Sequence, residues 1–103
     1  MSTEKIVITT NLRLDIIERR KEKGISSYDL SEQVGNGHSK FWLQNIESGK
    51  TKKIKKDDLL SIYMILEGSD DPNEVLPIIE HLLNQSLGDS VRPWYELIIP
   101  DSD

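Results

Sequence analysis

Apolar residues in the first part of the chain recur at helical spacing. Leu12, Ile16 and the aliphatic stem of Arg20 lie on one i, i+4 stripe, which predicts a helix that starts at Thr10 and stops at Gly24. Basic residues gather toward its C-terminal end, where positive charge is favoured by the helix dipole.

A second, shorter helix is expected after this glycine. Either Ser26 or Ser27 is a suitable N-cap, and Leu30 and Val34 supply the apolar positions. The run from Gly35 to Gly37 contains two glycines and an asparagine, residues that accept positive φ angles, so it predicts a turn.

The third helix is expected from Lys40 to about Ser48, with Ser39 as its N-cap and with Leu43 and Ile46 facing inward. Two short helices separated by a glycine-containing turn form a helix-turn-helix unit.

Aromatic residues occur within this unit and after it. Phe41 and Trp42 are neighbours, and neighbours on a helix cannot both face inward, so one is expected to pack against the core while the other lies outside. Tyr28 and Tyr63 are expected to be packing residues.

The stretch from Lys50 to Lys56 carries five lysines in seven residues and is expected to be a loop. Asp57 and Asp58 then open a fourth helix that Gly68 ends. A further helix is expected to start with Asp71 as N-cap and Pro72 in the first position. Pro77 predicts a kink or a new start.

The two ends of the chain are less regular. Residues 6–8 are apolar and fit either an extended arm or a strand. Residues 94–99 are β-prone and flanked by prolines, which predicts a short strand or a packed extended tail. We therefore expect an N-terminal arm (residues 1–9), a helix-turn-helix domain (residues 10–76), and a C-terminal amphipathic helix with an extended segment (residues 77–103).

Composition agrees with a globular protein, since 36% of the 103 residues are hydrophobic and 30% are charged. The net charge of −5 is unevenly distributed. Residues 10–68 carry eleven Lys and Arg against nine acids, whereas residues 69–103 carry one Arg against eight acids. The first part of the chain is therefore mildly basic and the last part acidic.

The sequence contains no cysteine, no apolar run near the length of about 20 residues that a membrane span needs, and no signal-peptide pattern. We therefore expect a cytoplasmic protein without disulfides that does not contact a membrane. His38 and His81 have no second ligand at metal spacing, so no metal site is expected. No nucleophile–base pair, framed carboxylate pair or phosphate-binding glycine loop is present, so we expect neither an enzyme nor a cofactor.

The ordered combination of several short motifs resembles a known family. These motifs are the end of the first helix at residues 23–26, residues 29–31 and 34–35 of the second helix, and the string Ile-Glu-Ser-Gly-Lys-Thr at residues 46–51. Together, residues 12–66 resemble the DNA-binding domain of lambdoid phage repressors and Cro proteins, the XRE-type family. The resemblance implies an all-α, lambda-repressor-like five-helix fold that carries the C-terminal helix and a short extended tail.

This resemblance also implies roles for individual residues. Base-reading positions fall on Lys40, Phe41, Gln44 and Asn45. Contacts to the DNA backbone fall on Ser27, Ser39, Lys50, Thr51, Lys52 and Lys53. Arg20 and Glu47 correspond to a buried structural ion pair between the first and third helices. The turn after Gly35 is about two residues longer than in the family, so the angle between the second and third helices is expected to differ.

The C-terminal segment has more apolar residues than a tail needs, so it either caps the domain's own core or forms a homodimer seam, which we favour. The candidates for the seam are Ile78, Ile79, Leu82, Leu83, Trp94 and Leu97. The sequence thus predicts a sequence-specific regulator of transcription that binds double-stranded DNA, most simply a homodimeric repressor. The alternative is a protein-interaction module on the same fold, an antitoxin or anti-repressor that binds a protein partner through its acidic C-terminal segment.

Overall fold

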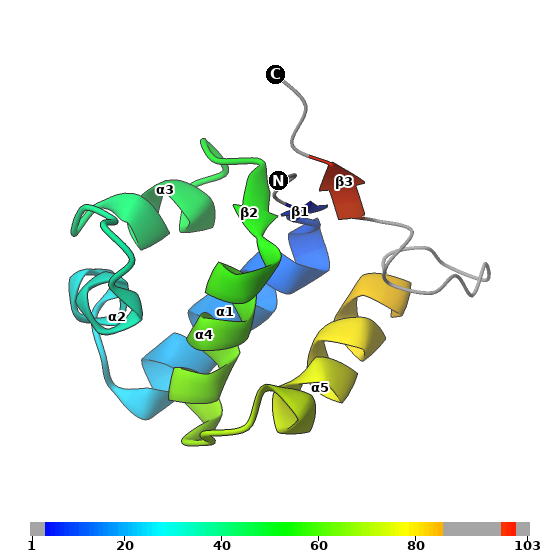
Figure 1. The fold of residues 1–103 in the computed structure, drawn as a ribbon. Coiled ribbons are helices and arrows are strands. Elements are labelled where there is room, and N and C mark those ends of the chain that lie inside the picture. Colours follow the sequence, from blue (N-terminus) through cyan, green and yellow to red (C-terminus); the bar gives the residue numbers. More distant parts are fainter. Residues whose placement is uncertain (1–3, 86–97, 101–103) are drawn as a thin grey trace.

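The computed structural model describes residues 4–85 and 98–100. These described residues are mostly helical, and they form five helices and a small sheet (Figure 1). The order of elements is β1 (Glu4–Val7), α1 (Thr10–Lys23), α2 (Ser27–Val34), α3 (Trp42–Glu47), β2 (Lys53–Lys55), α4 (Lys56–Glu67), α5 (Pro72–Gln85) and β3 (Ile98–Pro100). In the part of the chain that is described, no helix combines the length and the apolar character needed to cross a membrane.

Local signals in the sequence set most helix ends. Gly24 and Gly68 end α1 and α4 in the left-handed conformation, with φ of 76° and 68°. Asp71 caps α5, because its Oδ1 accepts a hydrogen bond from the backbone N–H of Asn73 at 2.9 Å. These expected boundaries are confirmed.

Helix α5 does not end at Pro77, which lies inside it. The proline leaves the carbonyl of Asn73 without its N–H partner, and because Asn73 and Pro77 are both exposed residues, this break in the helix bonding lies on the surface. The boundary expected after residue 76 therefore coincides with no end of an element, and residues 77–85 continue the preceding helix.

Three short strands form an antiparallel sheet in the order β2-β1-β3. Ile6 pairs with Ile54 of β2 and with Ile98 of β3. Of the two alternatives for residues 6–8, an extended arm or a strand, the structure shows a strand for Ile6 and Val7. The expectation of a loop throughout residues 50–56 is wrong, because residues 53–55 form β2 with Ile54 turned inward and a lysine exposed on either side. The main-chain bonds of β1 hold this segment extended.

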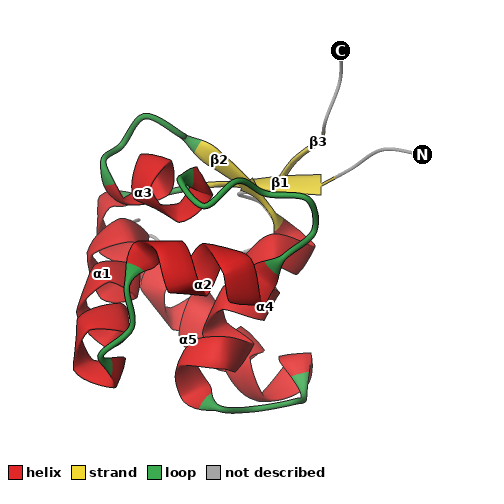
Figure 2. Cartoon of the chain, turned by 90° about the vertical axis from the view of Figure 1, so that its left-hand side faces the viewer, coloured by secondary structure: helices red, strands yellow, loops and turns green. Residues whose placement is uncertain are grey.

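One core joins the helices and the sheet. Its buried members are Ile6, Ile8, Leu12, Ile16, Leu30, Val34, Leu43, Ile46, Ile54, Leu59, Ile62, Tyr63, Leu66, Val75, Ile79 and Leu83. The side view shows α3 beside α2 at one side of the molecule, with the loop that leads to β2 running past α3 (Figure 2). This core fixes α3 from one side and leaves its other side outward.

Candidate nucleic-acid interface

Helix α3 is anchored by two buried aliphatic side chains and by a hydrogen bond to a side chain of α2. Leu43 and Ile46 have no exposed surface. The backbone N–H of Leu43 donates to the Oγ of Ser31, a buried residue of α2, at 3.0 Å. Ser31 thus satisfies one of the free N–H groups in the first turn of α3.

The prediction that Ser39 is the N-cap of α3 is wrong, because Ser31 supplies the side-chain acceptor for the first turn of this helix. The Oγ of Ser39 accepts only from the N–H of Phe41, at 3.3 Å, and α3 begins at Trp42 instead of Lys40. Lys40 and Phe41 therefore precede the helix. Both side chains are exposed, as is that of Gln44 one turn later, whereas Asn45 is half-buried. The structure brings Lys40, Phe41 and Gln44 to the outer side of this region.

The aromatic neighbours divide as their spacing predicted. Trp42 packs partly against the core and stacks on the ring of His38, with centroids 3.9 Å apart and planes 5° apart. Phe41 is exposed and meets the exposed Tyr28 of α2 edge-to-face. The packing role expected for Tyr28 is therefore wrong as regards the core, while Tyr63 is fully buried as expected.

The long turn between α2 and α3 is tied to α4. Gly35, Asn36 and Gly37 all have positive φ, of 71°, 56° and 78°. The side-chain N–H of Asn36 donates to Oδ1 of the buried Asp58 at 2.9 Å, and Nε2 of His38 lies 3.0 Å from Oδ2 of the same carboxylate. These contacts connect the extra residues of the turn to α4.

Sequence reasoning missed this role of Asp58, which was taken as a helix-start charge. It also missed Arg13 of α1, whose Nε donates to the carbonyl of Ile46 at 3.2 Å. A Cβ atom added to Gly49 would lie 3.7 Å from the guanidinium carbon of Arg13, so this cation lies close to the chain just after α3. A cation at this end satisfies a terminal carbonyl and suits the helix dipole.

Arg20 and Glu47 are brought together across α1 and α3. Nε and Nη2 of Arg20 donate to the two carboxylate oxygens of Glu47 at 2.7 and 2.8 Å. The side chains are only 14% and 13% exposed. Nη1 of Arg20 also donates to the carbonyl of Ile25 at 3.0 Å, so the pair joins three segments.

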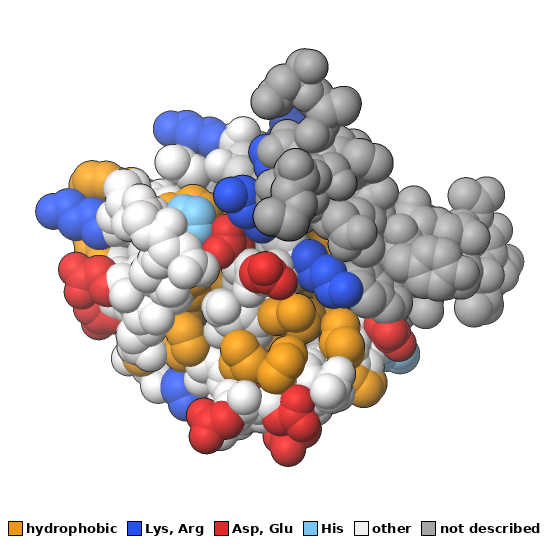
Figure 3. Space-filling view, viewed as in Figure 1, with side chains coloured by type: hydrophobic (Ala, Val, Ile, Leu, Met, Phe, Trp, Pro, Cys, Tyr) orange, Lys and Arg blue, Asp and Glu red, His pale blue; other side chains and the backbone are white. Residues whose placement is uncertain are grey.

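The residues expected at the DNA backbone fall into two groups. Ser26 is the N-cap of α2, with its Oγ accepting from the N–H of Asp29, and Ser27 is the half-buried first residue of the helix. On the other side of α3, the side chains of Lys50, Lys52 and Lys53 are exposed and Thr51 is half-buried. Basic side chains lie at the upper left of Figure 3, where Figure 1 shows the turn before α3 and the loop after it.

Comparison with known proteins assigns this chain no relative. It matches no family model, no curated protein and no solved structure. Among residues 4–85 and 98–100, no group of three or more His, Asp or Glu side chains is arranged to hold a metal ion.

The candidates for a dimer seam are not all exposed in the single chain. Ile79 and Leu83 are buried in the chain's own core, which favours the capping alternative for these two. Ile78 and Leu82 are half-buried against the same core. Trp94 and Leu97 lie outside the described residues.

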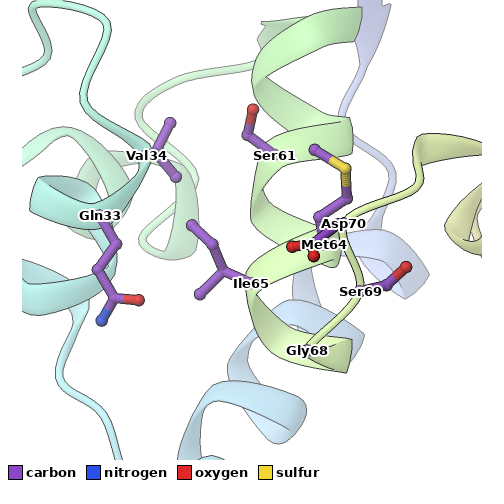
Figure 4. A pocket seen from close by; sticks show the side chains of 8 residues that line it. All are labelled: Gln33, Val34, Ser61, Met64, Ile65, Gly68, Ser69 and Asp70. Carbon is purple, nitrogen blue, oxygen red and sulfur yellow. The ribbon is translucent and has the colours of Figure 1, made fainter.

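A shallow open groove of about 470 Å³ lies between α2 and α4 (Figure 4). Val34, Met64 and Ile65 supply its apolar side chains, and the segment from Gly68 to Asp70 closes one end. Hydrophobic side chains also gather on this face of the molecule, in the lower middle of Figure 3.

Proposed function

We propose that the chain binds double-stranded DNA with sequence preference, through α3 and the turn before it, and acts as a homodimeric repressor of lambda-repressor-like fold. One observation carries the proposal. Leu43 and Ile46 hold α3 in the core, while Lys40 and Phe41, just before the helix, and Gln44, in its first turn, are exposed. A helix anchored on one side with polar groups at its exposed N-terminal end is what the major groove accepts.

The exposed side chains match the chemistry of base edges. A glutamine amide pairs with adenine through two hydrogen bonds, and a lysine ammonium donates to the acceptors of guanine. Because Asn45 is half-buried, Lys40 and Gln44 are better placed for this reading than Asn45.

Lysines after α3 supply the attraction to phosphate. Lys50, Lys52 and Lys53 are exposed, and the carbonyl of Lys52 accepts from the N–H of Ile8 at 2.9 Å, which fixes the loop beside the sheet. On α2, Asp29 and Glu32 are exposed acids. We therefore expect one DNA strand to run along the lysine loop and the middle of α2 to stay away from phosphate.

Dimerisation is part of the proposal because two recognition helices must reach successive major grooves, about 34 Å apart. Of the seam candidates that the structure describes, Ile78 and Leu82 on α5 are the half-buried ones and keep part of their surface exposed in the single chain. Sedimentation measurements on the wild-type chain and on Leu82→Lys test this part separately from DNA binding.

The decisive experiment is a salt titration of binding to duplex DNA, followed by selection of sites from a random duplex library. The logarithm of affinity should fall steeply with the logarithm of salt, and Lys52→Ala should reduce that slope by about one unit on every duplex. Lys40→Ala and Gln44→Ala should each cost about 1–3 kcal/mol at defined base pairs of the selected site. Absence of duplex binding at low salt would refute the proposal.

The groove between α2 and α4 favours one other function, a protein-interaction module on the same fold. Met64 and Ile65 leave apolar surface at this groove, and Met is well suited to contact varied partners. Under this alternative, Met64→Lys abolishes partner binding, whereas a DNA-binding protein keeps its salt-dependent duplex affinity in the same variant.

A further inference from the structure

Two exposed aromatic rings touch at the edge of the proposed interface. Among the described residues, the exposed large hydrophobic side chains are Leu14, Tyr28 and Phe41, and the last two are 43% and 46% exposed. Their ring centroids lie 5.3 Å apart at an interplanar angle of 90°. This aromatic contact lies outside the core, and it leaves apolar ring surface open to a ligand.

The pair is held in place by both helices. The N–H of Phe41 donates to Ser39 Oγ, and its carbonyl accepts from the N–H of Asn45 at 3.1 Å, at the start of α3. Tyr28 is the second residue of α2, in the first turn after the Ser26 cap. The rings therefore project from two fixed helix starts, not from a long loop.

Positive charge accompanies the aromatic pair. The Nζ of Lys40 lies over the Phe41 ring, 5.4 Å from its centroid. Figure 3 shows hydrophobic atoms next to basic side chains at the left-hand end of the molecule, where Figure 1 places α2 and α3. A surface that combines an ammonium with an apolar contact is complementary to polyanionic DNA that presents an apolar group.

We propose that Phe41, supported by Tyr28, reads the C5-methyl group of a pyrimidine in the major groove, an inference that rests on the proposed duplex binding. Bases in a duplex are stacked and offer only their edges, and the apolar group at these edges is the methyl group of thymine. The ammonium over one face of Phe41 and its edge-to-face contact with Tyr28 reduce the ring face available for stacking on an unpaired base. Contact with a methyl group needs only part of the ring.

The test replaces thymine by uracil, position by position, in the site selected by the wild-type chain. Uracil lacks only the methyl group, so wild-type affinity should fall about fourfold at one position, the factor that corresponds to about 0.8 kcal/mol for one buried methyl-sized group. Phe41→Ala should bind the thymine and uracil duplexes equally. Introducing 5-methylcytosine at each cytosine reports whether the methyl group that is read belongs to thymine or to a methylated cytosine.

Tyr28 is a positioning residue in this proposal, and a conservative pair of variants tests it. Tyr28→Ala should lower the thymine-to-uracil affinity ratio, and Tyr28→Phe should restore it, because the second ring is kept. Lys52→Ala is the matched control, since it should weaken both duplexes alike and leave the ratio unchanged. Circular dichroism establishes that each variant is folded, which is expected because both rings are exposed.

The outcomes separate this inference from the proposed function. If the wild-type chain binds its selected site but no pyrimidine methyl group affects affinity, or if Phe41→Ala keeps the same ratio, methyl reading is wrong and duplex binding stands. If no duplex is bound at all, the proposed function fails and the inference with it. Tighter binding to single-stranded DNA than to duplex would also overturn methyl reading.

Discussion

Breaking the ion pair between Arg20 and Glu47 tests how much the third helix depends on buried charge. Replacing Glu47 by Met removes both carboxylate acceptors and leaves the Arg20 guanidinium with the carbonyl of Ile25 alone. At 14% and 13% exposure, water reaches these groups poorly. Loss of one partner of a buried pair costs about 3–5 kcal/mol. We expect the lower end, about 3 kcal/mol, because the Ile25 bond remains.

Urea denaturation followed by circular dichroism, at a fixed protein concentration, measures this loss. For a domain of this size, about 3 kcal/mol corresponds to a fall in Tm of about 12–24 °C. The double variant Arg20→Met with Glu47→Met should recover much of the stability of either single variant, because no unpaired buried charge is left. The coupling energy from this double-mutant cycle isolates the pair.

A matched control uses the more exposed pair of Arg19 and Glu67, whose side chains are 32% and 34% exposed. Glu67→Gln should cost about 0–1 kcal/mol, as exposed pairs do. If Glu47→Met costs no more than Glu67→Gln, or if the two Met substitutions are additive, the burial argument is refuted.

Two further predictions concern single hydrogen bonds. Ser31→Ala leaves the buried N–H of Leu43 without its acceptor and should lower the free energy of unfolding by about 1–3 kcal/mol. The control Ser48→Ala, at an exposed position, should lower it by less than about 0.5 kcal/mol. Chemical denaturation compares the two variants directly. Burial and the hydrogen bond to Asp15 raise the pKa of Tyr63 above its ordinary value of 10.0. The phenol of the unfolded chain therefore ionises first as the pH rises. The contribution of Tyr63 to the free energy of unfolding is thus complete below pH 10 and is lost as the pH rises further. Stability curves of wild type and Tyr63→Phe should therefore diverge less above pH 10 than at pH 8; a constant difference would contradict this linkage.

Local signals explain which parts of the fold could be predicted. Gly24, Gly68 and Asp71 act on their own neighbours, so the ends that they set were correct. Ser39 was misjudged as a cap because the acceptor for the first turn of α3 comes from Ser31, on another helix. No short-range pattern records such a bond.

The sheet and the turn also separate features set by neighbouring residues from features set by distant ones. Strand β2 has one inward residue, Ile54, between exposed lysines, and its partner strand lies near the start of the chain, so the lysine-rich segment was read as a loop. The division of Phe41 and Trp42 into one exposed and one partly buried ring was expected, although Phe41 precedes α3 instead of lying in it. The bonds of Asp58 to the long turn were not expected, because an aspartate at a helix start already has a local electrostatic explanation.

The position of β1 between β2 and β3 has a consequence for biosynthesis. During translation, β1 leaves the ribosome first, β2 follows about midway, and β3 comes last of the three. One edge of β1 therefore keeps its main-chain groups unpaired until residues 98–100 have been made, although helices α1 to α5 all precede β3 in the chain. Between the synthesis of β1 and that of β3, the nascent chain thus carries an open strand edge, and that edge closes only when residues 98–100 reach it.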